Sequence, residues 1–209
     1  VTRATRPSAS RPIADASALC IPTASYGMAM RGPGAAWRFI AGHDRECPMT
    51  DQGWKSIGVL ELTALPSLPE AHWWPLVQAT DVLLVNGGDP MYLHHWLVRS
   101  GLAERLPSLH DRVYVCYSAG SMVMTPRIGE DFVGWKPPEG GDRTLGLVDF
   151  SIFPHLDHPM LPENTMADAE RWAARLGAPA YAIDDETALR VVDGRVDVVS
   201  EGHWKRFDR

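Results

Sequence analysis

The stretch that decides the fold is VYVCYSAGSMVM, from Val113 to Met124. Its first residues are apolar and β-branched, which predicts a buried strand over Val113–Tyr117, and a helix is predicted to follow over Ser121–Thr125. Ser118 stands at the turn between them, followed by small residues that let backbone atoms approach closely. A serine in such a turn is held in a strained conformation, with its hydroxyl at the carboxyl edge of the sheet. The stretch therefore makes Ser118 a candidate nucleophile.

The amide after this serine supports the same interpretation. The N–H of Ala119 lies at a helix N-terminus and points toward negative charge, so it can serve as one donor of an oxyanion hole. One position departs from the G-x-S-x-G pattern of such turns, because Cys116 replaces the first glycine and adds a Cβ where the turn is tight. Taken alone, the motif leaves a second interpretation open, in which Ser118 is an ordinary helix cap.

Outward from this turn, short apolar runs alternate with helix-length stretches. Strands are predicted over Ala18–Ile21, Ile57–Leu62, Asp81–Val85, Phe150–Phe153 and Ala180–Asp184, and helices over Ala71–Thr80, Pro90–Ser100, Leu102–Leu109 and Glu163–Leu176. This alternation predicts a doubly wound α/β fold, with a mostly parallel sheet and helices on both faces. At the C-terminal end, Ala188–Val192 and Val196–Ser200 flank Asp193-Gly194, which predicts a β-hairpin with a type I′ turn. Residues 27–53 show no assignable element.

Composition and charge narrow the class of protein. The chain has 209 residues with 20 basic and 26 acidic side chains, a formal net charge of −6, so we expect no nucleic-acid partner. The longest apolar runs are four or five residues, and no membrane partner is expected, because a span needs roughly 20. Three widely spaced cysteines fit neither a disulfide framework nor a metal knuckle. A reducing, cytoplasmic location is the default expectation.

The first seventeen residues differ in composition from the rest. They are rich in Arg, Pro and small residues, contain one acid and show no hydrophobic periodicity, which predicts a disordered leader over 1–17. An organellar transit segment is the alternative for this stretch. Residues 18–209 are expected to form a single α/β domain.

Two further strand ends carry candidate catalytic groups. In VLLVNGGDP the glycines let backbone N–H groups turn toward a bound carbonyl, and Gly88 is predicted to be the second oxyanion donor. In FSIFPHLDHP, His155 lies just past a strand and is the candidate general base. A metal site formed by His155, Asp157 and His158 is the alternative, but no further ligand occurs at a recognisable spacing. We therefore expect no metal and no cofactor.

A cluster of acids follows the strand of AYAIDDETALRV. A histidine that acts as a base needs a carboxylate to fix its tautomer and to stabilise its cationic form. Asp184, Asp185 and Glu186 stand together after this strand, and spacing alone does not choose among them. A solvated turn is the alternative interpretation.

Taken together, these segments resemble a known family. GGD before a helix, YSAGS after a strand, LGLVDFSIFPH and AIDDETALRV are similar in kind and in order to the motifs of the peptidase E (aspartyl dipeptidase) family, whose members are related to class I glutamine amidotransferase-like domains. The resemblance extends from about Ala18 to the C-terminus. It is specific as a set, although none of the motifs would be specific alone.

The resemblance implies a serine peptidase with a Ser-His-Glu triad that removes N-terminal aspartate from dipeptides and short peptides. Ser118 matches the nucleophile of that family and His155 its histidine, while Asp185 falls where the family has Glu, with Glu186 as the second choice. The resemblance also implies that the oxyanion donors are the amides of Gly88 and Ala119.

The resemblance also suggests substrate-binding residues. Arg171 would pair with the aspartate side chain of a substrate, as the bidentate geometry of guanidinium allows. Asp89 stands where the family often has Asn; its negative charge would oppose an acidic group and could instead hold the α-amino group of a substrate.

Two other functions stay open at this point. One is an amidotransferase-like domain, which would use a cysteine at the turn, whereas Cys116 lies two residues before it. The other is a non-catalytic domain that binds a small amino-acid-type ligand. The expected partner is a short peptide substrate, and a homodimer is left open.

Overall fold

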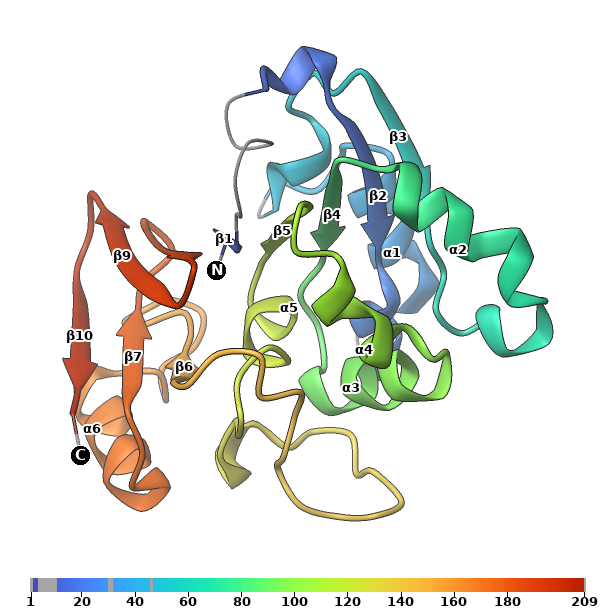
Figure 1. Cartoon of the computed structure of the whole chain (residues 1–209). Coiled ribbons are helices and arrows are strands. Elements are labelled where there is room, and N and C mark those ends of the chain that lie inside the picture. Colours follow the sequence, from blue (N-terminus) through green and yellow to red (C-terminus); the bar gives the residue numbers. More distant parts are fainter. Residues whose placement is uncertain (1, 4–10, 30–31, 46, 209) are drawn as a thin grey trace.

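The computed structural model describes residues 2–3, 11–29, 32–45 and 47–208 (Figure 1). Its strands are β1 (Thr2–Arg3), β2 (Ser17–Ile21), β3 (Ser56–Val59), β4 (Val82–Val85), β5 (Val113–Cys116), β6 (Ser151–Phe153), β7 (Ala180–Ile183), β8 (Thr187–Val192), β9 (Arg195–Ser200) and β10 (Trp204–Phe207). Its helices are α1 (Gly32–Ile40), α2 (Glu70–Ala79), α3 (Pro90–Arg99), α4 (Leu102–Arg105), α5 (Ala119–Met122) and α6 (Met166–Leu176).

The described strands form two sheets. A seven-stranded sheet has the order β3-β2-β4-β5-β1-β8-β9, and a three-stranded sheet has the order β10-β7-β6. The strands β3, β2, β4 and β5 run parallel to one another, as do β6 and β7, so their carboxyl ends lie at one edge of each sheet. The predicted α/β class with a mostly parallel central sheet is confirmed, but the strands divide between two sheets.

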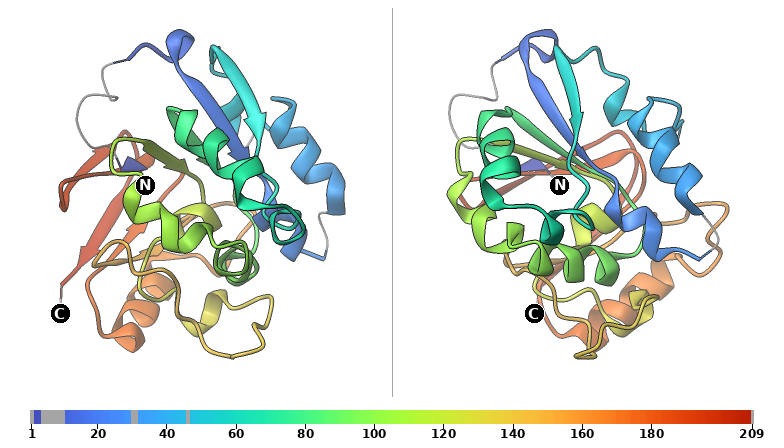
Figure 2. Two further views of the ribbon diagram at one scale, coloured as in Figure 1. Left: turned by 45° about the vertical axis from the view of Figure 1, so that its right-hand side comes forward. Right: turned by 90° about the vertical axis from the view of Figure 1, so that its right-hand side faces the viewer.

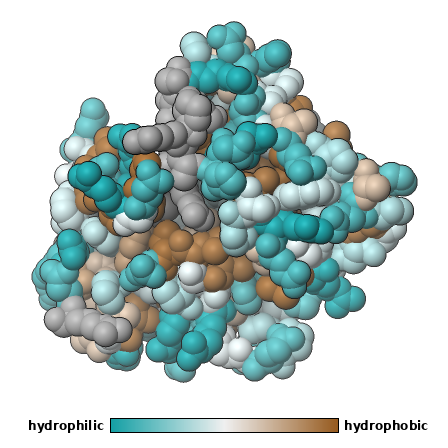
Figure 3. Space-filling model, viewed as in Figure 1, coloured by the Kyte–Doolittle hydropathy of each residue, from teal (hydrophilic) through white to brown (hydrophobic). Residues whose placement is uncertain are grey.

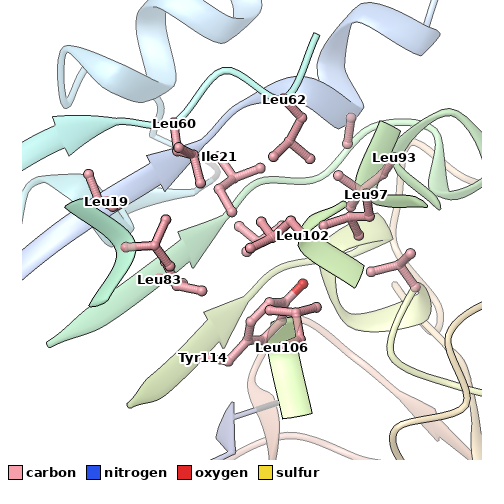
Figure 4. Packing of buried hydrophobic residues seen from close by; sticks show 14 of the residues in the cluster. Leu19, Ile21, Leu60, Leu62, Leu83, Leu93, Leu97, Leu102, Leu106 and Tyr114 are labelled. Carbon is pink, nitrogen blue, oxygen red and sulfur yellow. The ribbon is translucent and has the colours of Figure 1, made fainter. Parts of the chain in front are cut away.

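Side-chain alternation along β4 explains why helices cover both faces of the large sheet. Leu83 and Val85 belong to the core cluster that α2, α3 and α4 cover, part of which Figure 4 shows. Val82 and Leu84 instead pack with Phe39 of α1 on the other face. Figure 2 shows α1 and α2 on opposite sides of these strands. Burial on both faces accounts for the uninterrupted apolar sequence of this strand.

The small sheet is also covered on both faces. Ala180 and Ala182 of β7 pack with Trp172 of α6, while Tyr181 and Ile183 pack in a cluster with β8. Figure 1 shows α6 beside this sheet, at the end of the molecule away from β2 and β3. On the face in Figure 3 the surface is mostly polar, with apolar residues gathered near its middle. Within the described residues, no helix is both long enough and apolar enough to cross a membrane.

The C-terminal hairpin is confirmed. β8 and β9 pair antiparallel through the turn at Asp193 and Gly194, whose φ angles of 49° and 77° are both positive, as a type I′ turn requires. The helix predicted from Glu163 begins instead at Met166. Thr165 caps this helix and forms a capping box with Asp168, so the helix starts three residues later than predicted.

Beyond residues 1–17, α1 and β10 are the helix and the strand that were not predicted. α1 lies within residues 27–53 and begins Gly-Pro-Gly, a sequence with low helix propensity, but its Ala35, Ala36 and Phe39 are buried against the sheet. β10 is a short strand with mostly exposed side chains, so it carries no apolar alternation; its pairing with β7 defines it.

The leader predicted over 1–17 is partly described. Thr2–Arg3 forms β1 between β5 and β8, and Ile13–Asp15 forms a 3-10 turn. Residues 1 and 4–10 lie outside the described residues. Asp81 anchors the end of this segment: its carboxylate accepts hydrogen bonds from the N–H and hydroxyl of Ser17, both at 2.9 Å, and pairs with Arg11 at 2.6 Å.

Asp81 should stabilise the fold in a pH-dependent way. Partial burial raises the pKa of Asp81, but the Ser17 hydrogen bonds and then the charge of Arg11 outweigh it and leave the pKa below its ordinary value. We expect Asp81→Ala to lower the free energy of unfolding by about 1–3 kcal/mol at pH 7. Because the folded pKa is depressed, the contribution of the carboxylate is present above the unfolded pKa of about 3.9 and is lost as pH falls through the folded value.

Urea unfolding of the wild type and the variant at pH 7 and pH 3 measures this difference. The matched control is Asp111→Ala, because within the described residues that exposed carboxylate pairs only with its neighbour Arg112, at 2.7 Å, and should contribute less than about 0.5 kcal/mol. An Asp81→Ala effect of the same size at both pH values would contradict the assignment.

Candidate active site

Ser118 has the strained backbone that the sequence predicted. It follows β5 directly, with φ 49° and ψ −116°, a region that residues other than glycine rarely adopt. The helix after it holds this conformation, since the N–H groups of Ser121 and Met122 donate to the Ser118 carbonyl at 2.8 and 3.0 Å. α5 begins at Ala119, two residues earlier than the predicted helix. The turn is therefore tighter than the sequence indicated.

Close packing explains the small residues around this turn. A Cβ on Gly120 would lie 2.6 Å from the carbonyl oxygen of Val85, a backbone atom that cannot move without distorting β4. A Cβ on Gly87 would lie 3.1 Å from the Cβ of Ser118. Glycine at these two positions lets the loops after β4 and β5 lie against each other.

Cys116 does not occupy the nucleophile position. It is the last residue of β5, and its side chain packs against two core clusters. The hydroxyl of Ser121 also lies 3.4 Å from its sulfur, in hydrogen-bonding geometry. Its Cβ is accommodated because it belongs to the strand and not to the turn, so its position gives no support to an amidotransferase-like cysteine nucleophile.

Two amides at this edge of the sheet have the features of oxyanion donors. The N–H groups of Gly88 and Ala119 have no hydrogen-bond acceptor within the described residues. Neighbouring amides are engaged: Gly87 donates to Asn86 Oδ1 at 2.8 Å, Asp89 to Ala24 O at 2.9 Å, and Gly120 to Tyr117 O at 2.9 Å. Gly88 has φ +143°, and a Cβ there would lie 2.2 Å from Ala24 O, so only glycine fits.

His155 and Asp185 are brought together across the small sheet. His155 follows β6 and Asp185 follows β7, and the imidazole Nδ1 lies 2.6 Å from a carboxylate oxygen of Asp185. At this distance Nδ1 carries the proton toward the carboxylate, which leaves Nε2 as a proton acceptor. The side chain of His155 is 15% exposed and that of Asp185 is 38% exposed. The pair is thus accessible from solvent at the strand ends.

The two sheets meet at Tyr117 and His155. Ser118 and Gly88 follow strands of the large sheet, whereas His155 follows a strand of the small one. The rings of Tyr117 and His155 are in edge-on contact, with centroids 5.3 Å apart, so the imidazole lies beside the residue that precedes Ser118. In the described part of the chain no hydrogen bond joins the Ser118 hydroxyl to this ring; such bonds are often long before substrate binds.

The backbone around His155 is also strained and externally held. Its φ is 55°, and the next N–H, that of Leu156, donates to the carbonyl of Ile183 at the end of β7 at 3.0 Å. The side-chain amide of Asn164 donates to the carbonyl of Pro154 at 2.9 Å. These bonds fix the imidazole over the end of β7, where Asp185 follows.

The structure distinguishes the three clustered acids. Asp184 accepts hydrogen bonds from the Thr187 hydroxyl at 2.6 Å and from the His203 N–H at 2.5 Å. Partial burial raises the pKa of Asp184, but these hydrogen bonds outweigh it and lower the pKa below its ordinary value. The carboxylate of Glu186 makes no hydrogen bond or ion pair within the described residues, so Asp185 is the acid that meets His155.

Asp89 is not available to hold the amino group of a substrate, contrary to the prediction. It is buried, and its two carboxylate oxygens accept from the N–H of Tyr92 at 2.9 Å and from that of Trp135 at 2.5 Å. Burial raises the pKa of Asp89. The residue caps α3 and anchors the loop that contains Trp135.

Arg171 is likewise not brought to the site. It lies on the exposed face of α6, where its guanidinium pairs with Asp168 of the same helix, and its side chain is 61% exposed. No hydrogen bond or ion pair connects it with Ser118, His155 or Asp185 in the described residues. Helical periodicity explains this, because the neighbouring Trp172 occupies the buried face.

The alternative metal site does not form within the described part of the chain. No group of three or more His, Cys, Asp or Glu side chains there is placed to hold a metal ion. His155 is engaged with Asp185, while Asp157 is engaged with His203 at 2.8 Å. His158 lies nearby, with its Nε2 3.6 Å from the second oxygen of Asp185.

Three residues that shape this site were not predicted from the sequence. Asn86 orients the glycine loop through Gly87, and Tyr117 packs against His155. Both could have been predicted from their positions, because Asn86 directly precedes the glycines and Tyr117 directly precedes the serine. His203 contacts Asp157 and Asp184 from a distant part of the chain, and no spacing in the sequence indicates that contact.

Comparisons with known proteins identify a family and similar folds. Residues 46–199, more than half of the chain, match the model of peptidase family S51. A candidate peptidase E from Listeria monocytogenes EGD-e has a similar fold, with TM-score 0.66 and 18% identity over 91% of this chain and 89% of that chain. A peptidase from an acI-B1 Actinobacterium gives TM-score 0.66 and 19% identity over 92% and 80%. No curated protein sequence matches this one. The chain therefore belongs to peptidase family S51, the family of peptidase E.

Proposed function

We propose that the protein is a serine peptidase that hydrolyses short peptides as a dipeptidase or exopeptidase. Membership of peptidase family S51 supports a peptidase. The observation that carries the serine-type mechanism is the 2.6 Å hydrogen bond between His155 and Asp185, formed beside the residue that precedes a strained Ser118. A nucleophile, a base and an orienting carboxylate, here at strand ends where the two sheets meet, are the components of a triad.

In the proposed reaction, Ser118 Oγ attacks the peptide carbonyl carbon while its proton passes to Nε2 of His155. Asp185 accepts from Nδ1 and stabilises the imidazolium, and the amides of Gly88 and Ala119 donate to the oxyanion. The imidazolium gives its proton to the leaving amine as the C–N bond breaks, which leaves an ester on Ser118. Water then attacks the ester, loses a proton to Nε2, and releases the acid product and the free serine.

The proposed substrates are dipeptides and short peptides, with N-terminal aspartate as the leading candidate. That preference derives from the resemblance of the motifs to peptidase E. The two residues predicted to bind the substrate do not support it, because Asp89 is buried as a helix cap and Arg171 pairs with Asp168. Selection of an acidic side chain would have to come from other residues.

Hydrolysis of a dipeptide panel, combined with labelling by a fluorophosphonate, tests the proposal. We expect cleavage of at least one class among Asp-X, Glu-X and neutral dipeptides, and stoichiometric labelling at Ser118, because an unactivated serine does not react. Heat-denatured protein is the control for non-specific labelling. Absence of both cleavage and labelling would overturn the proposal in favour of a non-catalytic binding domain. Faster cleavage of neutral dipeptides than of Asp-X would overturn only the aspartate preference.

A further inference from the structure

A second histidine lies between two carboxylates next to the proposed triad. Nε2 of His203 is 2.8 Å from Asp157, and its Nδ1 is 3.0 Å from Asp184. The backbone of His203 makes the same connection, since its N–H donates to the Asp184 carboxylate at 2.5 Å and its carbonyl accepts from the N–H of Asp184 at 3.4 Å. His203 therefore connects the segment of Asp157 with the segment of Asp184, which is distant in the sequence.

These two segments carry the proposed base and acid. Asp157 is two residues after His155, in the loop between β6 and α6, and Asp184 directly precedes Asp185. His203 directly precedes β10, which pairs with β7 (Figure 1). A Cβ on Gly202 would lie 2.0 Å from the Asp184 carboxylate, so glycine lets the chain come this close.

We propose that His203 is a positioning residue, which holds the loop of His155 against the turn of Asp185 and so keeps the imidazole and its carboxylate in register. The inference rests on the proposed function, since it concerns the same triad. Its basis is the pair of contacts from one imidazole ring to Asp157 and Asp184. Misplacement of a catalytic pair by about 1 Å can cost on the order of 100-fold in rate.

The loop of His155 needs such an external support. His155 and Asp157 both have positive φ, 55° and 54°, a conformation that costs free energy and persists only when surrounding contacts impose it. Asp157 and Asp184 lie at opposite nitrogens of the His203 ring, and a protonated imidazole supplies an N–H donor to each carboxylate. His203 thus provides this support.

The charge state of His203 matters for this role. The charged groups that face its ring are Asp157, from the loop after β6, and Asp184, from the end of β7. The hydrogen bond to Asp157, with the charge of Asp184, raises the pKa of His203 above its ordinary value. The ring therefore keeps both N–H donors to a higher pH than an isolated histidine, and loses one donor when it deprotonates.

Substitution of His203 tests the proposal. We expect His203→Ala to lower kcat about 10-fold with KM changed less than about twofold, because positioning acts on the reaction and not on ground-state binding. His203→Gln, whose side-chain amide can still donate to Asp157, should recover kcat to within about threefold of the wild type. The wild-type alkaline decline in kcat that reflects deprotonation of His203 should be absent from the Gln variant. His72→Ala, an exposed histidine on α2, is the matched control.

A readout that does not need activity is the NMR signal of the His155 Nδ1 proton, which the 2.6 Å contact with Asp185 protects from exchange with water. In His203→Ala this signal should broaden or move upfield, because the contact between His155 and Asp185 is loosened. If the alanine variant does not fold, Asp157→Asn removes one partner of His203 and should lower kcat and weaken the Nδ1 proton signal in the same way.

Unchanged kcat and an unchanged Nδ1 proton signal of His155 in a folded His203→Ala variant would overturn the inference. Lower kcat with no rescue by His203→Gln and no change in the Nδ1 proton signal would also overturn it, since a general loss of structure would explain that pattern. A wild type that neither cleaves peptides nor labels at Ser118 would reject the proposed function instead, while the Nδ1 proton signal of His155 would still decide whether His203 positions the pair.

Discussion

Replacing Ser118 with alanine should lower kcat/KM for peptide hydrolysis by about 10⁴- to 10⁶-fold, to the level that substrate binding and oxyanion donors sustain without a nucleophile. Alanine is smaller than serine and adds no group to the tight turn after β5, so the thermal midpoint of unfolding should change by only a few degrees. Steady-state kinetics on the best dipeptide, a thermal unfolding scan and fluorophosphonate labelling are the measurements.

The neighbouring serine provides a matched control. Ser121 lies on α5, three residues after Ser118, and its hydroxyl lies within hydrogen-bonding distance of Cys116. Ser121→Ala should therefore keep labelling and keep kcat/KM within about tenfold of the wild type. Hydrolysis that persists in purified Ser118→Ala, or labelling that disappears only in Ser121→Ala, would mean that the nucleophile has been assigned wrongly.

The parts of the fold that the sequence predicted are those in which local and tertiary preferences agree. β4 is buried on both faces, so its apolar run is continuous and its position is unambiguous. The Asp193-Gly194 turn needs two positive φ angles, and Asp-Gly is a dipeptide that readily adopts them. Gly120 lies against the backbone of β4, as the small residues after Ser118 had indicated.

The missed elements depend on contacts that sequence alone does not display. α1 begins with two glycines and a proline, so its helical state reflects burial of Phe39 against the sheet and not intrinsic propensity. β10 has mostly exposed side chains and is defined by its hydrogen bonds to β7. Thr2–Arg3 joins the large sheet through partners more than a hundred residues away in the sequence.

The candidate site shows the same division. Strand ends located Ser118 and His155, because parallel strands place such residues at one edge. Asp89 was predicted to bind a substrate amino group, because an aspartate at a helix start can either cap the helix or bind a ligand. The hydrogen bond from the N–H of Trp135 shows that its carboxylate is already engaged. Arg171 was predicted to bind the substrate from the family resemblance alone, but on α6 its guanidinium pairs with Asp168. The choice between Asp185 and Glu186 required the distance to His155.

Asp185→Asn should lower kcat by about 10⁴-fold while KM changes by less than about tenfold. Asparagine has nearly the same shape, but its amide can donate a proton toward Nδ1 of His155, at the 2.6 Å contact, which favours the tautomer with the proton on Nε2. That tautomer cannot accept the proton of Ser118. Asparagine also removes the negative charge that stabilises the imidazolium. The loss should therefore appear in kcat, because both effects act in the transition state.

Glu186→Gln is the matched control for this substitution. It removes the same charge from the adjacent position, but the carboxylate of Glu186 has no partner within the described residues, so kcat should stay within about threefold of the wild type. Asp185→Glu adds one methylene to the acid that meets His155 and should give an intermediate kcat, because the carboxylate must be accommodated at the same contact. If Glu186→Gln were the damaging change and Asp185→Asn harmless, Glu186 and not Asp185 would be the acid that acts with His155. The two variants thus decide which of the two adjacent carboxylates supports the base.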